Sequence, residues 1–160
     1  MPTVAALAPP VGLPPGLAQV EWISPVLRAE PFDDADWVFE PRYDGFRALL
    51  QGSTQGCQIR VSSPIARRAR ELRDRVADVL GGREAILDGE IVALDHGGKP
   101  VLQHLLRGEG YLAFAAFDLL WLDGADLRDL PLKARKQQLA ELLPEDTGRL
   151  YKILTIEEHG

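Results

Sequence analysis

The clearest periodic pattern in the chain lies between Ile65 and Val79, where apolar residues recur at spacings of three and four. This spacing places them on one side of a helix, so the pattern predicts an amphipathic helix over residues 63–82. Ser63 is a suitable N-cap for that helix, and Gly81 is a suitable end.

Shorter apolar runs between turn residues indicate strands. We expect strands over residues 37–43 and 45–52, around a turn at Asp44-Gly45, and over residues 57–63. Residues 84–95 form two runs about a central Asp-Gly-Glu, and residues 111–124 form one or two buried strands. A second helix over residues 131–144 and a last strand over residues 149–155 follow. Antiparallel-looking strands with two isolated helices favour an α+β domain over a doubly wound sheet.

Composition limits the domain count and the setting. The chain has 160 residues, of which 46% are hydrophobic and 26% charged, as expected of one soluble domain. Residues 1–19 are rich in Pro and Gly and predict a flexible arm, so residues 20–160 form the domain. No run reaches the ~20 apolar residues of a membrane helix, and no signal peptide is evident. The single cysteine, Cys57, fits a reducing cytoplasm.

The charge balance argues against one class of function. The net charge is −6, whereas duplex binding relies on Lys and Arg that neutralise phosphates. The chain as a whole is therefore not expected to be a free-standing DNA clamp. Only four lysines occur, so arginine supplies most of the positive charge.

Charged clusters interrupt three apolar runs: Glu40 to Arg47, Asp88-Gly89-Glu90, and Asp118. Charges in such runs are costly unless they are paired or used in function. Each cluster alone is explained by a turn or by an ion pair at a strand edge. The order of the three along the chain points to a site.

These clusters resemble the motifs of a known family, the covalent nucleotidyltransferases, and within it the ATP-dependent DNA ligases of bacterial end-joining type. "EPRYDGFR" is similar to the nucleophile motif Lys-x-Asp-Gly-x-Arg, "ILDGEIVALD" to the Asp-Gly-Glu motif, and "AFDLLWLDG" to the Phe-Asp-hydrophobic motif. A family-like "DLRDLPLKARKQQL" follows. The resemblance runs from about Trp22 to the end of the chain.

The resemblance implies a role for each motif residue. Asp44 and Gly45 belong to the frame of the nucleophile motif. Phe117 would stack on the adenine of ATP, and Glu40 would lie near its exocyclic amine. The implied roles of the remaining two residues concern the sugar and phosphates: Arg47 would contact the ribose or phosphate end, and Glu90 would engage the ribose or Mg²⁺. One or two carboxylates suffice for Mg²⁺ when phosphate oxygens complete its shell.

Arg42 departs from the family, because it occupies the position of the lysine that would attack the α-phosphate of ATP. A guanidinium stays protonated and has no lone pair to offer, so lysyl-AMP is not expected to form. Lys99 and Lys152 show no sign of reaching the site. Three explanations of Arg42 stay open: drift after lost activity, retained binding of a phosphate by its planar fork, and a role that needs a partner chain.

The resemblance covers the front part of a ligase only. An expected arginine is missing at Ser63-Pro64-Ile65, and the family's later Glu-Gly and Lys-x-Lys motifs and its OB-fold would follow Gly160. We therefore expect a C-terminally incomplete adenylation-domain fold whose open side is covered by self-association or a protein partner.

Three hypotheses of function follow. The first is a degenerate ligase-family protein of DNA repair and recombination. The second is a non-catalytic module that binds a nucleotide, or weakly a nicked or broken DNA end, with a partner repair protein. The third is a ligase completed by a separate chain.

Other candidate residues favour structural roles. The arginines of the 63–82 helix alternate with acids, as in Arg70 and Asp74, which indicates a solvated and self-paired face. The three histidines, His96, His104 and His159, lack partners at metal spacing, so zinc is not expected. Cys57 has no base near it in the sequence and reads as a structural thiol.

Overall fold

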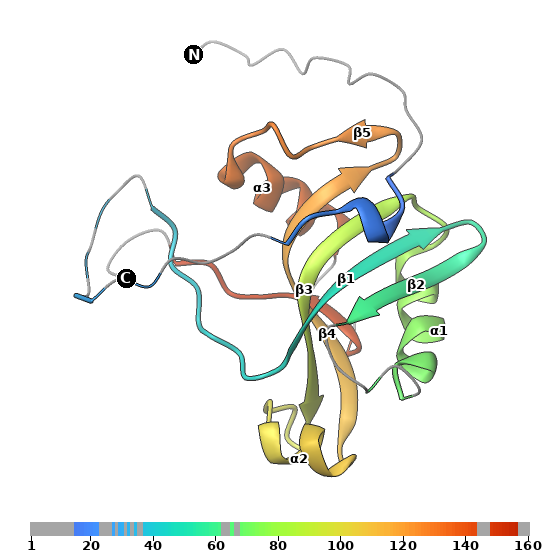
Figure 1. The fold of residues 1–160 in the computed structure, drawn as a ribbon, viewed down its shortest axis with the longest axis vertical. Coiled ribbons are helices and arrows are strands. Elements are labelled where there is room, and N and C mark those ends of the chain that lie inside the picture. The colour runs from blue at the N-terminus through green and yellow to red at the C-terminus, as the bar shows by residue number, and fades with distance from the viewer. Residues whose placement is uncertain are drawn as a thin grey trace.

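The computed structural model describes residues 15–22, 27, 29–30, 32, 34, 37–61, 65, 68–143 and 148–156. Their order is η1 (Leu17–Gln19), β1 (Phe46–Ser53), β2 (Gly56–Val61), α1 (Ala69–Leu80), β3 (Ala85–Leu94), α2 (Leu102–Arg107), β4 (Tyr111–Leu122), β5 (Ala125–Asp126), α3 (Leu132–Leu142) and β6 (Leu150–Lys152). The strands form one six-stranded sheet in the order β2-β1-β3-β4-β5, with β6 paired to β4 (Figure 1). The predicted α+β class is confirmed, and the sheet is antiparallel except for the β4–β6 pair.

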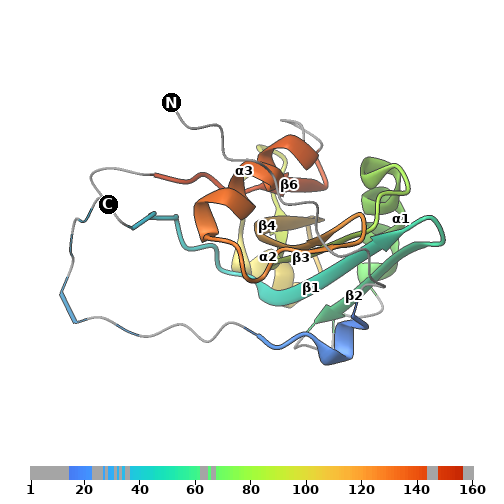
Figure 2. The same ribbon diagram turned by 90° about the horizontal axis from the view of Figure 1, so that it is seen from above.

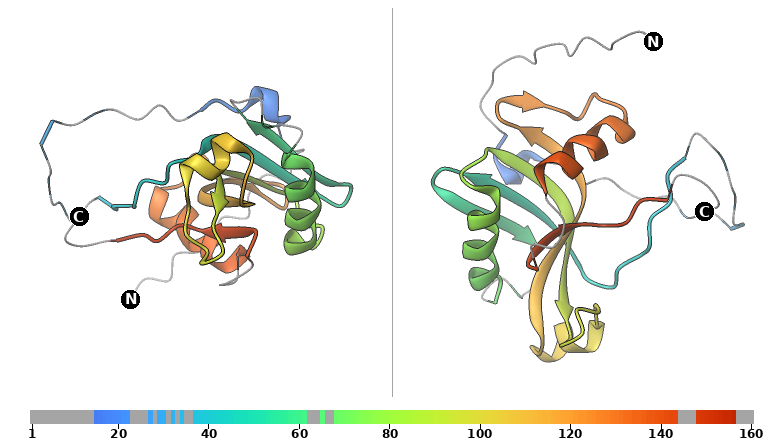
Figure 3. Two further views of the ribbon diagram at one scale, coloured as in Figure 1. Left: turned by 90° about the horizontal axis from the view of Figure 1, so that it is seen from below. Right: turned by 180° about the vertical axis from the view of Figure 1, so that it is seen from behind.

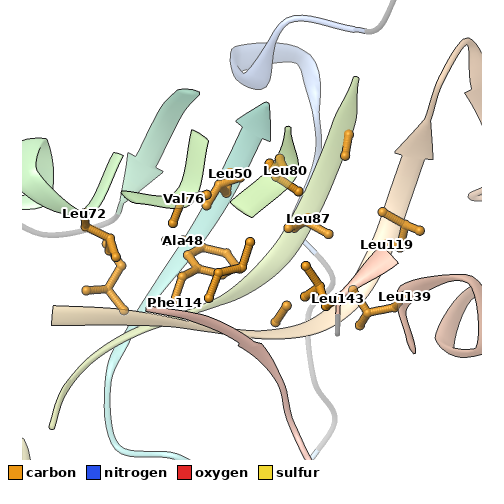
Figure 4. Close-up of a cluster of buried hydrophobic side chains, with 14 of the residues drawn as sticks. Ala48, Leu50, Leu72, Val76, Leu80, Leu87, Phe114, Leu119, Leu139 and Leu143 are labelled. Carbon is orange, nitrogen blue, oxygen red and sulfur yellow. The ribbon is translucent and has the colours of Figure 1, made fainter. Parts of the chain in front are cut away.

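The helices α1 and α3 cover one face of this sheet (Figure 3, right). Gly81 ends α1 in the left-handed conformation, with φ 58°, as its position predicts. The predicted cap Ser63 lies outside the described residues. Leu72 and Val76 of α1 and Leu139 of α3 are fully or almost fully buried, in the cluster drawn in Figure 4. Burial of this apolar stripe, rather than helix propensity, fixes both helices on the sheet.

The opposite face carries a smaller apolar cluster that includes Leu49 and Trp121. The segment around η1 packs on it through Leu17 and Val20, which are 8% and 3% exposed (Figure 2). The predicted arm over 1–19 therefore has its last residues against the sheet, and residues 1–14 lie outside the described range. None of the helices in the described part of the chain is long and apolar enough to cross a membrane.

Two strand predictions need correction. Residues 37–43 were expected to form a strand, but among them only Phe39 forms a bridge, to Ile156. The Asp-Gly-Glu segment was expected to divide two runs, but it is the middle of one strand, β3. The predicted last strand is present as β6 and lies parallel to β4. Strand partners so distant in sequence are set by tertiary packing, which local patterns do not contain.

Asp44-Gly45 is likewise not a hairpin turn. The chain at Gly45 passes so close to β3 that an added Cβ would lie 2.5 Å from the carbonyl oxygen of Ile91. Gly89 has the same constraint, since its Cβ would lie 2.4 Å from the carbonyl oxygen of Ala115. Both motif glycines are thus required by close backbone approach, which no other residue permits.

Candidate nucleotide site

A pocket of about 630 Å³ lies on the sheet face opposite α1. The loop before β1, the strands β1, β3 and β4, and the residue after β6 build its walls. It is lined by Leu27, Glu40, Pro41, Arg42, Tyr43, Arg47, Glu90, Ala115, Phe117 and Ile153. Five of the predicted site residues therefore converge, from segments up to 77 residues apart (117 − 40). Asp44 and Gly45 stand beside the pocket without lining it.

Phe117 of β4 reaches the pocket by ordinary strand alternation. Ala115 also lines the pocket, and Ala116 between them lies in the hydrophobic core. A β-bulge follows, since Gly89 pairs with Ala116 while Asp88 pairs with Asp118, so Phe117 has no partner in the register. The bulge therefore changes the alternation after Phe117 and brings Asp118 opposite Asp88.

Arg47 forms one wall of the pocket and is held on two sides. Its Nε and Nη2 donate to the two carboxylate oxygens of Asp88, both at 2.7 Å. Its guanidinium carbon lies 4.5 Å from the centre of the Phe117 ring and 5.8 Å from that of Trp22, within the range of cation–π attraction. Arg47 therefore also fixes the orientation of the Phe117 ring.

The acids Asp88 and Asp118 pair across β3 and β4, and both are buried. Burial raises the pKa of Asp88, and the hydrogen bonds from Arg47 limit that rise. Asp118 accepts from Nε and Nη2 of Arg135, both at 2.8 Å, and this pairing raises the pKa of Arg135. Asp88 and Asp118 thus each belong to a structural ion pair. This agrees with the simpler interpretation of their clusters, in which the charges are paired instead of used in function.

Glu90 differs from these acids because one of its oxygens has no partner. Its Oε2 is buried without a hydrogen bond, at the wall of the pocket. Burial raises the pKa of Glu90, and the nearby charges of Arg47 and Arg42 and the neighbouring backbone amide of Gly45 limit the rise. An unpaired buried carboxylate oxygen costs free energy. It is therefore suited to accept from a ligand hydroxyl or to bind a cation.

Arg42 lies at the mouth of the pocket and is the most exposed of its charged residues. Its side chain is 91% exposed, and its Nε lies 3.8 Å from Asp44 Oδ1. So exposed an ion pair contributes little to stability. The side chain of Arg42 therefore contributes little to the stability of the fold.

Lys136 of α3 is a site residue that the sequence reasoning missed. Its Nζ donates to the carbonyl oxygen of Phe117 at 2.6 Å and forms an ion pair with Glu40. The signal was present, because Lys136 lies three and seven residues before Leu139 and Leu143, in the same helical stripe, and both leucines are buried. A lysine in a buried stripe requires a partner.

The remaining candidates lie elsewhere. Lys99 borders a neighbouring groove with Arg42, and His96 and His104 line a separate hollow near α2. Among the residues the structure describes, no group of three or more His, Cys, Asp or Glu side chains is placed to hold a metal. Cys57 is half-buried, and burial raises its pKa to about 12, which suits a structural thiol. His159 lies outside the described residues.

An antiparallel sheet that brings Asp-Gly-x-Arg, Asp-Gly-Glu and Phe-Asp motifs to one nucleotide-sized pocket defines the class of ligase-type adenylation domains. The profile of the family "ATP dependent DNA ligase domain" matches residues 17–158. The chain belongs to this family, as the resemblance of its motifs predicted.

Two curated relatives illustrate the relationship. The multifunctional non-homologous end joining protein LigD of Pseudomonas aeruginosa is 33% identical over 137 residues, which cover 77% of this chain and 16% of that protein. A probable DNA ligase of Streptomyces avermitilis is 36% identical over 121 residues, covering 66% of this chain and 23% of that protein. The chain thus spans less than a quarter of the length of either.

Solved structures support the fold. A mycobacterial DNA ligase D complexed with ATP and MES superposes with a TM-score of 0.60 at 25% identity, over 77% of this chain and 41% of that chain. The ligase domain of Mycobacterium tuberculosis LigD gives a TM-score of 0.58 at 26% identity, over 73% and 40%. The chain therefore has the fold of part of a ligase domain.

Proposed function

We propose that this chain binds an adenine nucleotide in the pocket and does not form lysyl-AMP at Arg42, as a ligase-like protein of end-joining DNA repair. The observation that carries the proposal is the position of Arg42. Arg42 lies at the mouth of a pocket that also contains the motif residues Glu40, Arg47, Glu90 and Phe117, at the position where the family has its nucleophilic lysine. A guanidinium cannot attack phosphorus, but it can hold a phosphate with its planar fork.

Each wall of the pocket suits one part of the nucleotide. The half-buried ring of Phe117 offers a stacking surface for the base, and Glu40 offers an acceptor at its edge. The unpaired oxygen of Glu90 suits a ribose hydroxyl. The exposed guanidinium of Arg42 suits the phosphates. The guanidinium of Arg47 is less available, because two of its nitrogens donate to Asp88. Binding of an adenine nucleotide is supported by the mycobacterial DNA ligase D, which was solved in complex with ATP.

Mg²⁺ fits the same site through Glu90. Mg²⁺ keeps several waters and takes few protein ligands, so one carboxylate beside nucleotide phosphates is an adequate donor set. When bound, the ion would neutralise phosphate charge. Within the chain, Glu90 would hold it and Arg42 would share the neutralisation.

The proposal is tested in two steps. Isothermal titration calorimetry with ATP and Mg²⁺ should show saturable binding, and a flat titration at millimolar nucleotide would remove the proposal. Incubation with ATP labelled at the α-phosphate should then give no protein-bound label that survives boiling in detergent.

Arg42→Lys is the matched variant for the labelling step. It restores an amine at the family's position without changing the charge. We expect no label here either, because none of the described lysines lines the pocket to neutralise the departing pyrophosphate. Label in this variant alone would show that only the amine is lacking. Label in the unaltered chain would contradict the proposal.

A second candidate function, a binding module that acts with another repair protein, is favoured by exposed apolar side chains. Leu154 is 65% exposed and Ile156 is 39% exposed, next to the pocket residue Ile153. Trp37, 47% exposed, lies two residues before the bridge partner of Ile156. Light scattering coupled to size-exclusion chromatography tests the alternative, self-association: a dimer that is lost in Leu154→Ser would assign this surface to a second copy of the chain and contradict the second candidate.

A further inference from the structure

Lys136 makes two contacts that bring α3 to the edge of the pocket. Its side chain is 11% exposed, and its ammonium group bonds both the Glu40 carboxylate and the Phe117 carbonyl oxygen, the latter at 2.6 Å. Both oxygens lie within hydrogen-bond reach of one nitrogen. The Glu40 carboxylate is therefore close to the backbone of Phe117, whose ring lines the pocket. In the nucleotide binding proposed above, Glu40 is the acceptor at the edge of a base stacked on that ring.

We propose that Lys136 is a positioning residue that makes the pocket select bases carrying an amino group at this edge, adenine over guanine. The inference rests on the proposed nucleotide binding. The ammonium of Lys136 donates to the Glu40 carboxylate and holds it in one place. Glu40 therefore presents acceptor oxygens to the base. Adenine presents its 6-amino donor there, whereas guanine presents a 6-oxo acceptor, and two acceptors that face each other in a closed site repel.

The fold does not account for the burial of Lys136. The apolar residues Leu139 and Leu143 already attach α3 to the sheet, and Arg135 ties it to Asp118. A buried ammonium adds a desolvation cost to a helix that is held without it. The partners of Lys136, in contrast, are a pocket residue and the backbone of another, which is the arrangement expected of a residue that orients a binding site.

Lys136 is not placed as the missing nucleophile. Its Nζ is engaged by Glu40 and by the Phe117 carbonyl oxygen, and Lys136 is not among the residues that line the pocket.

The test compares ATP and GTP binding by calorimetry in Lys136→Met, in the conservative Lys136→Arg, and in Lys133→Met, a matched control on the same helix. We expect Lys136→Met to weaken ATP binding about tenfold, the usual scale for loss of a charged hydrogen-bond partner, while GTP binding changes less than about twofold. Lys136→Arg should keep most of the preference for ATP. Lys133→Met should leave both affinities unchanged.

A purely structural role of Lys136 would weaken the binding of ATP and of GTP together. Equal losses of the two affinities in Lys136→Met, which leave their ratio unchanged, would therefore overturn the inference. Glu40→Gln guards against misfolding of the lysine variant, because it alters one atom group at the pocket and should abolish the same preference. The double variant should then be no worse than the worse single variant. If the unaltered chain binds neither nucleotide, the proposed function fails. If it prefers ATP and the variants keep that preference, only the role of Lys136 fails.

Discussion

Arg135 offers the most direct test of how charge holds α3 against the sheet. Its side chain is 12% exposed, and it donates to both oxygens of Asp118 and, through Nη1, to the carbonyl oxygen of Leu130 at 2.5 Å. In Arg135→Met, the apolar stem is kept, but Asp118 stays 3% exposed with only the Leu119 amide, at 2.8 Å, as a described partner. Removal of one member of a buried ion pair costs about 3–5 kcal/mol.

Urea unfolding followed by tryptophan fluorescence measures this loss, with the buried Trp121 as a reporter. With a slope of about 2 kcal/mol per molar, the midpoint should fall by roughly 2 M. The control is Arg128→Met, which breaks a similar pair with Asp126, but one whose side chains are 46% and 34% exposed. That pair contributes about 0–1 kcal/mol. If Arg135→Met and Arg128→Met lose equal stability, the ion pair with Asp118 is not what holds α3.

Two further predictions concern the motif glycines and Glu90. Gly89→Ala should destabilise the protein by about 3 kcal/mol or more, because its Cβ would meet a backbone oxygen at 2.4 Å; Gly16→Ala, which meets no atom within 4 Å, should be near neutral in the same urea assay. Glu90→Gln should raise the melting temperature at pH 7 by on the order of 2 °C. Burial raises the pKa of Glu90, so the folded protein disfavours its charged form. The protein with glutamate is therefore more stable at low pH, and it loses that stability as the pH rises through the pKa of Glu90 in the folded state. The difference from glutamine should vanish near pH 4, where glutamate is protonated; equal melting temperatures at both pH values would contradict this reasoning.

Most of the motif residues singled out in the sequence lie together in the structure, whereas part of the sheet around them was predicted wrongly. Motifs of a few residues carry the local chemistry, and Glu40, Arg47, Glu90 and Phe117 do line one pocket. The strand boundaries near them were less accurate, since Asp-Gly next to an apolar run is also a common turn signal. What distinguishes Gly45 from a turn is the proximity of β3, a contact with a segment 46 residues away (91 − 45).

The charge partners were beyond the reach of local patterns for the same reason. Arg47 and Asp88 are 41 residues apart, and Lys136 and Glu40 are 96 apart. Each of these residues has a polar neighbour in sequence that would serve as an alternative partner. The lysine in the apolar stripe of α3 was the one local sign that a distant carboxylate must be present.

The acids of the pocket region differ in what the fold requires of them. Asp88 and Asp118 each have an arginine partner, so stability alone explains them. Glu90 is a different case, because its Oε2 is buried without a hydrogen bond and burial raises its pKa. Its replacement by glutamine would stabilise the protein, so the fold gives no reason for a carboxylate at this position. A carboxylate that the fold does not need, beside the exposed Arg42, therefore supports a pocket that binds a ligand.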